Sequence, residues 1–301
     1  MKNFITQILL AFSLLWIAGS VPAWAFTQED IAFLEEELAK KEAYNAIKQH
    51  RIDSIRDADT NTYAQLLALT KEYQSYSYDT ATIYVEKLID EATHLNSHEK
   101  MVQAQTRHAF IFLSSGLFKE SADVLEQMAD DVPACPPDIQ ADYYITYSRL
   151  LYDMADYTHG QLANDYRTQG HKMSEQALRL INPQDTAHYW LTAAQYAMKQ
   201  NDEALAIERF ERALGCSAIS EHNRAIAYSS MGALYDVLGD KPRSEHYWIL
   251  AAIADLHSCT KEAIAMSMVA QMLYRQGDID HAARYIKEAM DDANFYNARH
   301  R

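Results

Sequence analysis

The residues of this sequence best suited to chemistry are three cysteines, twelve histidines and one short acidic run. Cys135, Cys216 and Cys259 form no CxxC pair and are odd in number, so we expect free or partly buried thiols rather than a disulfide. His94 and His98 are four residues apart, but a histidine pair at a helix end is more often solvated than bound to a metal. The sequence therefore predicts no metal site.

The acidic run Asp57-x-Asp59-x-Asn61 resembles the start of a calcium-binding loop. The sixth position is Thr62 where that loop needs glycine, and the twelfth is Ala68 where it needs glutamate. No phosphate-binding glycine loop, G-x-S-x-G elbow or kinase signature occurs elsewhere. We therefore predict no catalytic residue and no cofactor; a hydrolase with an unrecognised site is the alternative that a substrate screen would test.

A pattern of small residues and turns repeats three times between His188 and Ala289. Its columns advance by 38 residues, as from Ala194 to Gly232 and from Gly232 to Ala270. Asn201-Asp202, Gly239-Asp240 and Gly277-Asp278 form a column of turns, and further small residues follow at Ala206, Ser244 and Ala282 and at Ala213, Ala251 and Ala289. A small residue, a turn and two more small residues at a fixed period are typical of helix-turn-helix repeats.

This pattern resembles the tetratricopeptide repeat (TPR), whose usual period is about 34 residues. The resemblance implies an all-α, right-handed α-α superhelix of about six hairpins behind an N-terminal capping helix. The extra four or so residues make about one helical turn, most simply placed in a longer second helix. Only 8 glycines and 6 prolines also favour an almost entirely helical chain. An ordinary helical bundle is the alternative, but it needs no fixed period.

We divide the chain into a signal peptide over 1–25, a capping helix over 26–58, two irregular hairpins over 59–132, one long irregular hairpin over 133–185, and three regular repeats with the C-terminal helix end over 186–301. An apolar stripe that includes Ile31, Leu34 and Leu38 predicts the capping helix over the first repeat. A short coiled-coil dimer is the alternative for that stripe. Gly170 is expected to mark a bend in the long hairpin.

The first 25 residues have the form of a signal peptide. Lys2 precedes an uncharged apolar run from Ile5 to Val21, and Ala23-Trp24-Ala25 matches the A-x-A cleavage pattern. This predicts export to the periplasm or cell envelope, with Phe26 as the first mature residue. An uncleaved membrane anchor is the alternative, although the apolar run is short for a span.

The charge balance limits the partners. Lys+Arg 27 against Asp+Glu 42 gives a net charge of −15, which argues against direct binding to nucleic acid or to an anionic membrane. In TPR arrays the first helices of successive hairpins line a concave groove that binds a protein or peptide. The positions expected to face this groove are Phe110, Arg149, Tyr152, His188, Gln195, Lys199, Asp236, Gln271, Tyr274 and Arg275.

A narrower resemblance lies in the N-terminal half. Its motifs are Leu34-x6-Lys41-x2-Tyr44, Lys48-x2-Arg51-Ile52-x2-Ile55 and Tyr76-x-Tyr78-Asp79-x-Ala81-x2-Tyr84. They resemble a family of Bacteroidota envelope proteins catalogued as a domain of unknown function. That resemblance implies a signal peptide, TPR hairpins, a transmembrane helix beyond Arg301 and a cytoplasmic regulatory segment. The chain would then be the periplasmic sensing part of a membrane-linked regulator; a stand-alone adaptor for envelope assembly or glycan uptake is the alternative.

The cleavage site gives a direct prediction. Sequencing the N-terminus of the protein purified from the cell envelope should begin at Phe26, because Ala23 and Ala25 satisfy the small-residue requirement of signal peptidase. Recovery of a form that still begins at Met1 would instead make residues 1–25 an anchor.

Overall fold

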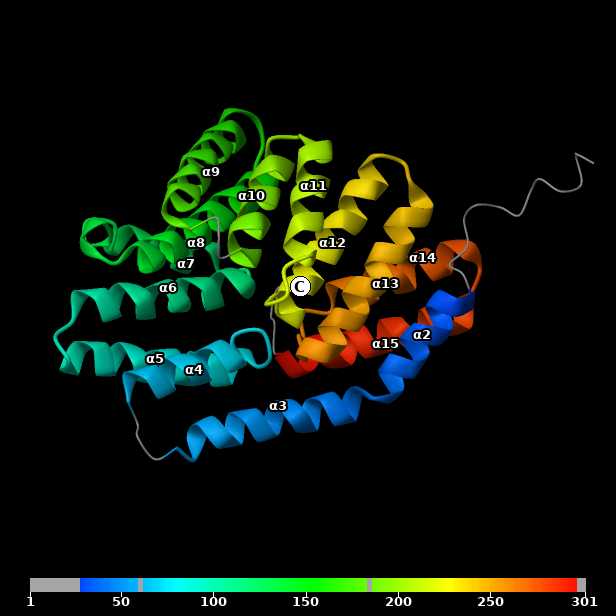
Figure 1. Cartoon of the computed structure of the whole chain (residues 1–301), viewed down its shortest axis with the longest axis horizontal. Coiled ribbons are helices and arrows are strands. Elements are labelled where there is room, and N and C mark those ends of the chain that lie inside the picture. Colours follow the sequence, from blue (N-terminus) through cyan, green and yellow to red (C-terminus); the bar gives the residue numbers. More distant parts are fainter. Residues whose placement is uncertain (1–27, 59–61, 183–185, 297–301) are drawn as a thin grey trace, which may run out of the picture.

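The computed structural model describes residues 28–58, 62–182 and 186–296, and within these ranges every regular element is a helix. The predicted signal peptide, with Ala23, Ala25 and Phe26, lies outside them. Hairpins follow one another around the molecule (Figure 1): α4 (Tyr63–Tyr73) with α5 (Tyr78–His94), α6 (His98–Ser114) with α7 (Phe118–Gln127), α8 (Pro137–Asp156) with α9 (Gly160–Leu180), α10 (Ala187–Lys199) with α11 (Glu203–Leu214), α12 (Glu221–Val237) with α13 (Lys241–Ser258), and α14 (Ile264–Gln276) with α15 (Ile279–Tyr296). This confirms the predicted all-α repeat fold. None of these helices is long and apolar enough to cross a membrane.

Small residues lie where the paired helices approach each other, as the repeat columns predict. Gly232 is buried in α12, and a Cβ atom there would lie 2.9 Å from the Trp248 ring of α13. The Ser244 hydroxyl donates to the Gly232 carbonyl at 2.8 Å. The same contact, from the Ser121 hydroxyl to the Ala109 carbonyl at 2.9 Å, joins α6 to α7. The irregular second hairpin therefore obeys the same packing rule as the regular repeats.

The turn column also behaves as predicted. Asn201, Gly239 and Gly277 have φ values of 58°, 76° and 88°, the left-handed region that asparagine and glycine tolerate best. The aspartate that follows caps the next helix: the Asp202 carboxylate accepts from the Leu205 amide, and the Asp240 carboxylate from the Arg243 amide, both at 3.1 Å. Each turn therefore both reverses the chain and starts the second helix.

The prediction of one capping helix over 26–58 is wrong. This segment forms α2 (Gln28–Ala39) and α3 (Lys41–Arg56), which meet at Lys40 (φ −92°, ψ 0°). The break lets the two helices pack against opposite ends of the array. Leu34 and Leu38 of α2 join the apolar core of α13, α14 and α15, whereas Ile52 of α3 joins the core of α4 and α5. The N-terminal helices therefore bridge the first and last hairpins rather than cover the first alone.

The two ends of the array also touch each other directly. In the α4–α5 turn, the Ser75 carbonyl accepts from the Lys261 amide at 2.9 Å, and the Gln74 carbonyl accepts from the Tyr296 hydroxyl at 3.0 Å. Lys261 belongs to the α13–α14 loop, and Tyr296 ends α15. We call these contacts, together with those of α2 and α3 on α13 and α15, the junction. The junction closes the array into a ring of hairpins.

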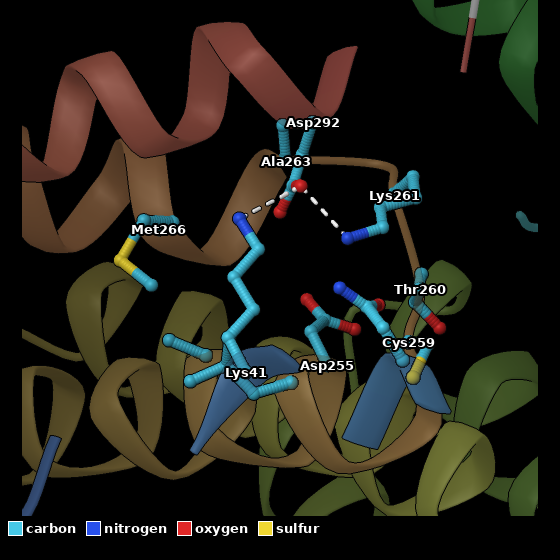
Figure 2. Close-up of a pocket in the computed structure, with 11 residues that line it drawn as sticks. Lys41, Asp255, Cys259, Thr260, Lys261, Ala263, Met266 and Asp292 are labelled. Atoms are coloured by element: carbon cyan, nitrogen blue, oxygen red, sulfur yellow. Dashed lines mark hydrogen bonds and ion pairs between the residues drawn. The ribbon is translucent and has the colours of Figure 1, made fainter. Parts of the chain in front are cut away.

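Charged groups hold the junction together. Figure 2 shows the ammonium groups of Lys41 and Lys261 converging on one Asp292 carboxylate oxygen, at 2.9 and 2.8 Å. Lys41 also reaches Glu288 at 2.9 Å. Burial by itself lowers the pKa of Lys41, but its hydrogen bonds to Asp292 and Glu288 raise the pKa overall. Lys41, Lys261 and Asp292 line a small cavity together with Asp255. Burial raises the pKa of Asp255 well above its ordinary value.

A second charged contact joins α2 to α13. The buried Glu37 carboxylate accepts hydrogen bonds from the Tyr44 hydroxyl, from the His257 ring at 2.7 Å and from the Lys40 ammonium at 2.9 Å. Chiefly because of the Tyr44 hydrogen bond, the pKa of Glu37 falls to about 2. The ionised carboxylate is therefore the form that stabilises the junction.

The helix contact at Gly232 gives a stability prediction. Gly232→Leu should lower the free energy of unfolding by about 1–3 kcal/mol or more, because its side chain must displace the Trp248 ring. Gly215→Ala is the control, since a Cβ atom there meets only backbone oxygens at an ordinary 3.5 Å. A denaturant titration in which both variants match the wild type would show that Gly232 is not a close contact.

The second stability prediction concerns pH. A folded-state pKa of about 2, against 4.5 without interactions, means that Glu37 stabilises the fold fully above about pH 4.5. That stabilisation, on the order of 3 kcal/mol at most, is lost as the pH falls towards 2. Glu37→Gln should therefore be less stable than wild type at pH 7, and the difference should shrink below pH 4.5.

The exposed neighbour Glu36 provides the control for this experiment. Its side chain is largely in solvent and forms an ion pair with Lys40, so Glu36→Gln should change stability little at either pH. If the stability difference between wild type and Glu37→Gln stays constant from pH 7 to pH 3, the ionised Glu37 carboxylate is not the form that stabilises the junction.

Candidate functional site

A cavity of about 240 Å³ lies between the first helices α8 and α10, with a contribution from α9. We call it the inner pocket. Four of the ten residues predicted for the groove line it: Arg149, Tyr152, Gln195 and Lys199. Its other lining residues are Ile145, Ser148, Asp153, Ser174, Thr192 and Met198. The first helices of two successive hairpins therefore bring these predicted side chains together.

Each of the two cations of the inner pocket lies over an aromatic ring. The Arg149 guanidinium is 5.3 Å from the centroid of Phe110 on α6, and the Lys199 ammonium is 5.5 Å from that of Tyr152. Each also has an acidic partner on α8: Lys199 pairs with Asp156 at 2.9 Å, and Arg149 with Asp153 at 3.8 Å. Phe110 thus joins the same cluster as a fifth predicted residue, and both cations have a ring and a carboxylate as neighbours.

Tyr152 is almost fully buried, since only 6% of it is exposed. Its hydroxyl is within hydrogen-bond distance of His171 Nδ1 at 2.9 Å and of Ser174 Oγ at 3.1 Å. Burial raises the pKa of Tyr152 to about 12, so the phenol stays neutral. Tyr152 therefore forms the base of the pocket.

Gly170 explains how the Tyr152 ring is accommodated. The predicted bend at Gly170 is wrong, since α9 runs through it as one helix from Gly160 to Leu180. A Cβ atom at Gly170 would lie 2.7 Å from the Tyr152 ring. Glycine at this position therefore lets α9 approach the base of the inner pocket.

His188 lies in a different hollow. That hollow, of about 720 Å³, is lined by residues of α4, α6, α8 and α10 and by the end of α9. His188 shares it with Lys71 and with Arg107 and Asp142, which form an ion pair. The structure therefore does not place His188 with the residues of the inner pocket.

The four remaining predicted residues are exposed and line neither hollow. Asp236 lies near the end of α12, and Gln271, Tyr274 and Arg275 lie on α14. Arg275 donates a hydrogen bond to Gln271 at 3.2 Å, and Tyr274 is 66% exposed. Lys199 lines the inner pocket, whereas Tyr274 and Arg275 lie on α14 and line neither hollow.

Several residues that line the pocket were not among the positions predicted from the sequence, although helical spacing could have identified them. Ile145 and Ser148 precede the predicted Arg149 and Tyr152 by four residues each, and Thr192 precedes Gln195 by three. Residues three or four apart share one face of a helix. Extending each predicted position by one turn would therefore have included them.

The chemistry of the inner pocket suits binding. The Thr192 and Ser148 hydroxyls donate to carbonyls of their own helices, at 2.9 Å in both cases. The half-buried Gln195 side chain, by contrast, has no hydrogen bond to any residue within 28–58, 62–182 and 186–296. No group of three or more His, Cys, Asp or Glu side chains in those ranges could hold a metal ion. The pocket therefore offers an amide without an internal hydrogen bond, together with two cations.

Similarity to known proteins is found with one sequence family and with solved structures. The sequence profile of the family described as the SusR N-terminal TPR domain matches residues 38–301. No curated protein matches the chain. Among solved structures, the crystal structure of MamA is 13% identical with a TM-score of 0.35, covering 62% of this chain and 94% of that one. The apo form of the quorum sensor NprR from B. thuringiensis is 15% identical with a TM-score of 0.44, covering 91% of this chain and 81% of that one.

Proposed function

Because the chain belongs to the family of SusR N-terminal TPR domains, we propose that it is a non-enzymatic protein-interaction scaffold. It binds an extended segment of a protein or peptide on the first helices of its hairpins, at the inner pocket. The observation that carries this proposal is the Gln195 amide, which lines the inner pocket together with Arg149 and Lys199 and has no hydrogen-bond partner among the described residues. An amide both donates and accepts, so it can pair with the backbone of an extended chain.

The size and charge of the inner pocket support the same proposal. A cavity of about 240 Å³ is small for a drug-sized ligand, which usually occupies about 300–1,000 Å³, and suits a single large side chain of a longer segment. The two cations favour an anionic segment there, while the net charge of −15 disfavours its binding elsewhere on the surface. Arg149 and Lys199 can exchange part of their pairing with Asp153 and Asp156 for a carboxylate of the partner.

The cellular setting is part of the proposal. We place the scaffold in the periplasm, as the sensing part of a membrane-linked regulator. Lys2, the uncharged run from Ile5 to Val21 and the Ala23-Trp24-Ala25 site support export. The family is described as an N-terminal domain, which supports a further part joined to it in a regulator.

A pull-down from envelope extract tests the binding site. The Arg149→Ala, Gln195→Ala, Lys199→Ala triple variant should recover at least about tenfold less of the partners, a loss of about 1.4 kcal/mol or more. The matched control is Gln271→Ala, Tyr274→Ala, Arg275→Ala, which changes three exposed residues that line neither hollow. This control should recover the partners as well as wild type does.

Thermal melts must first show that both triple variants are folded. If the inner-pocket variant is folded and recovers the same partners at the same salt concentration, the inner pocket is not the binding site. If the control variant is the one that loses them, binding belongs to α14 instead.

A further inference from the structure

The last helix, α15, has an apolar stripe that its own hairpin does not cover. Ile279, Ala283, Ile286 and Met290 are exposed, the three larger ones by 52%, 42% and 59%. Their spacing of four, three and four residues places them in one line along the helix. An apolar line with this spacing is typical of the seam along which two helices pack side by side in a coiled coil.

The other faces of α15 are already occupied. Ala282, Tyr285 and Ala289 are buried in the core that α15 shares with α13 and α14. On another face, Arg284 forms an ion pair with Glu35 of α2, and Glu288 with Lys41 of α3. Within 28–58, 62–182 and 186–296, the stripe is therefore an apolar face of α15 that stays exposed, in an array whose hairpins bury such faces against their neighbours.

The charges beside the stripe indicate what covers it. Asp280 and Lys287 flank it on the same side, seven residues apart, and both are exposed. Neither forms an ion pair with a residue in the described ranges. When two copies of one helix pack antiparallel, the same flank of each meets the other, so Asp280 of one copy lies opposite Lys287 of the second, and the reverse.

We propose that α15 pairs antiparallel with α15 of a second copy of this chain, across a two-fold axis. The interface is isologous, with Ile279, Ala283, Ile286 and Met290 in its centre and two Asp280–Lys287 pairs at its edge. One helix from each copy buries little area, so the dimer belongs to the small, transient class of interfaces and depends on concentration. It lies away from the inner pocket, which is built from α8, α9 and α10.

Sedimentation equilibrium of the purified protein over a range of concentrations tests the proposal. The wild type should pass from the monomer mass to twice that mass as concentration rises. Ile286→Glu should remain monomeric, because it puts two carboxylates into the centre of the seam. Glu86→Lys reverses an exposed charge on α5, away from the stripe. It is the control and should dimerise as wild type does.

A charge exchange tests the antiparallel geometry. Asp280→Lys alone and Lys287→Asp alone each place like charges opposite one another, so each should weaken the dimer at least about tenfold at low salt. The double variant restores opposite charges and should recover the wild-type affinity. A wild type that stays monomeric at every concentration, an Ile286→Glu variant that dimerises normally, or a double variant that is no better than the singles would overturn the proposal.

Discussion

The structure depends on one constraint: a repeat array has two ends, and each end leaves an apolar face that must be covered. Here the first segment of the chain packs on both ends and covers part of each. Leu34 and Leu38 of α2 enter the core of the last hairpins, while Ile52 of α3 enters the core of the first. Because those helices are only one residue apart, the two ends are held close.

Electrostatics makes the closure specific. A buried carboxylate is stable only when donors surround it, and Glu37 and Asp292 each receive donors from segments far apart in the sequence. Removing one partner would leave the other charge buried and unpaired, which costs more than the pair contributes. The same reasoning separates the junction from the inner pocket. There, Arg149 and Lys199 keep part of their side chains in solvent, so they can change partners at a small cost.

The sequence could predict what short-range rules determine. The turn residues, the aspartate caps and the small residues at helix contacts all lie within one repeat, and each was found where the 38-residue period placed it. The junction could not be predicted in this way, because Glu37 and His257, or Gln74 and Tyr296, belong to no shared repeat column and meet across more than 200 residues. The inner pocket is intermediate: the groove positions counted from the repeat columns included five residues of its cluster, but the burial of Tyr152 depends on Gly170 of the following helix.

If the array is closed, its two ends stay close together in solution, and a distance measured between them shows whether they do. Glu42 of α3 and Asp291 of α15 are exposed and line the same cavity of about 600 Å³. Spin labels at these two positions, in a chain whose three cysteines are replaced by serine, would report their separation by electron–electron dipolar spectroscopy. A closed array predicts one narrow distribution at short distance. A broad distribution that extends to long distances would mean that the ends part in solution and that the junction does not close the array.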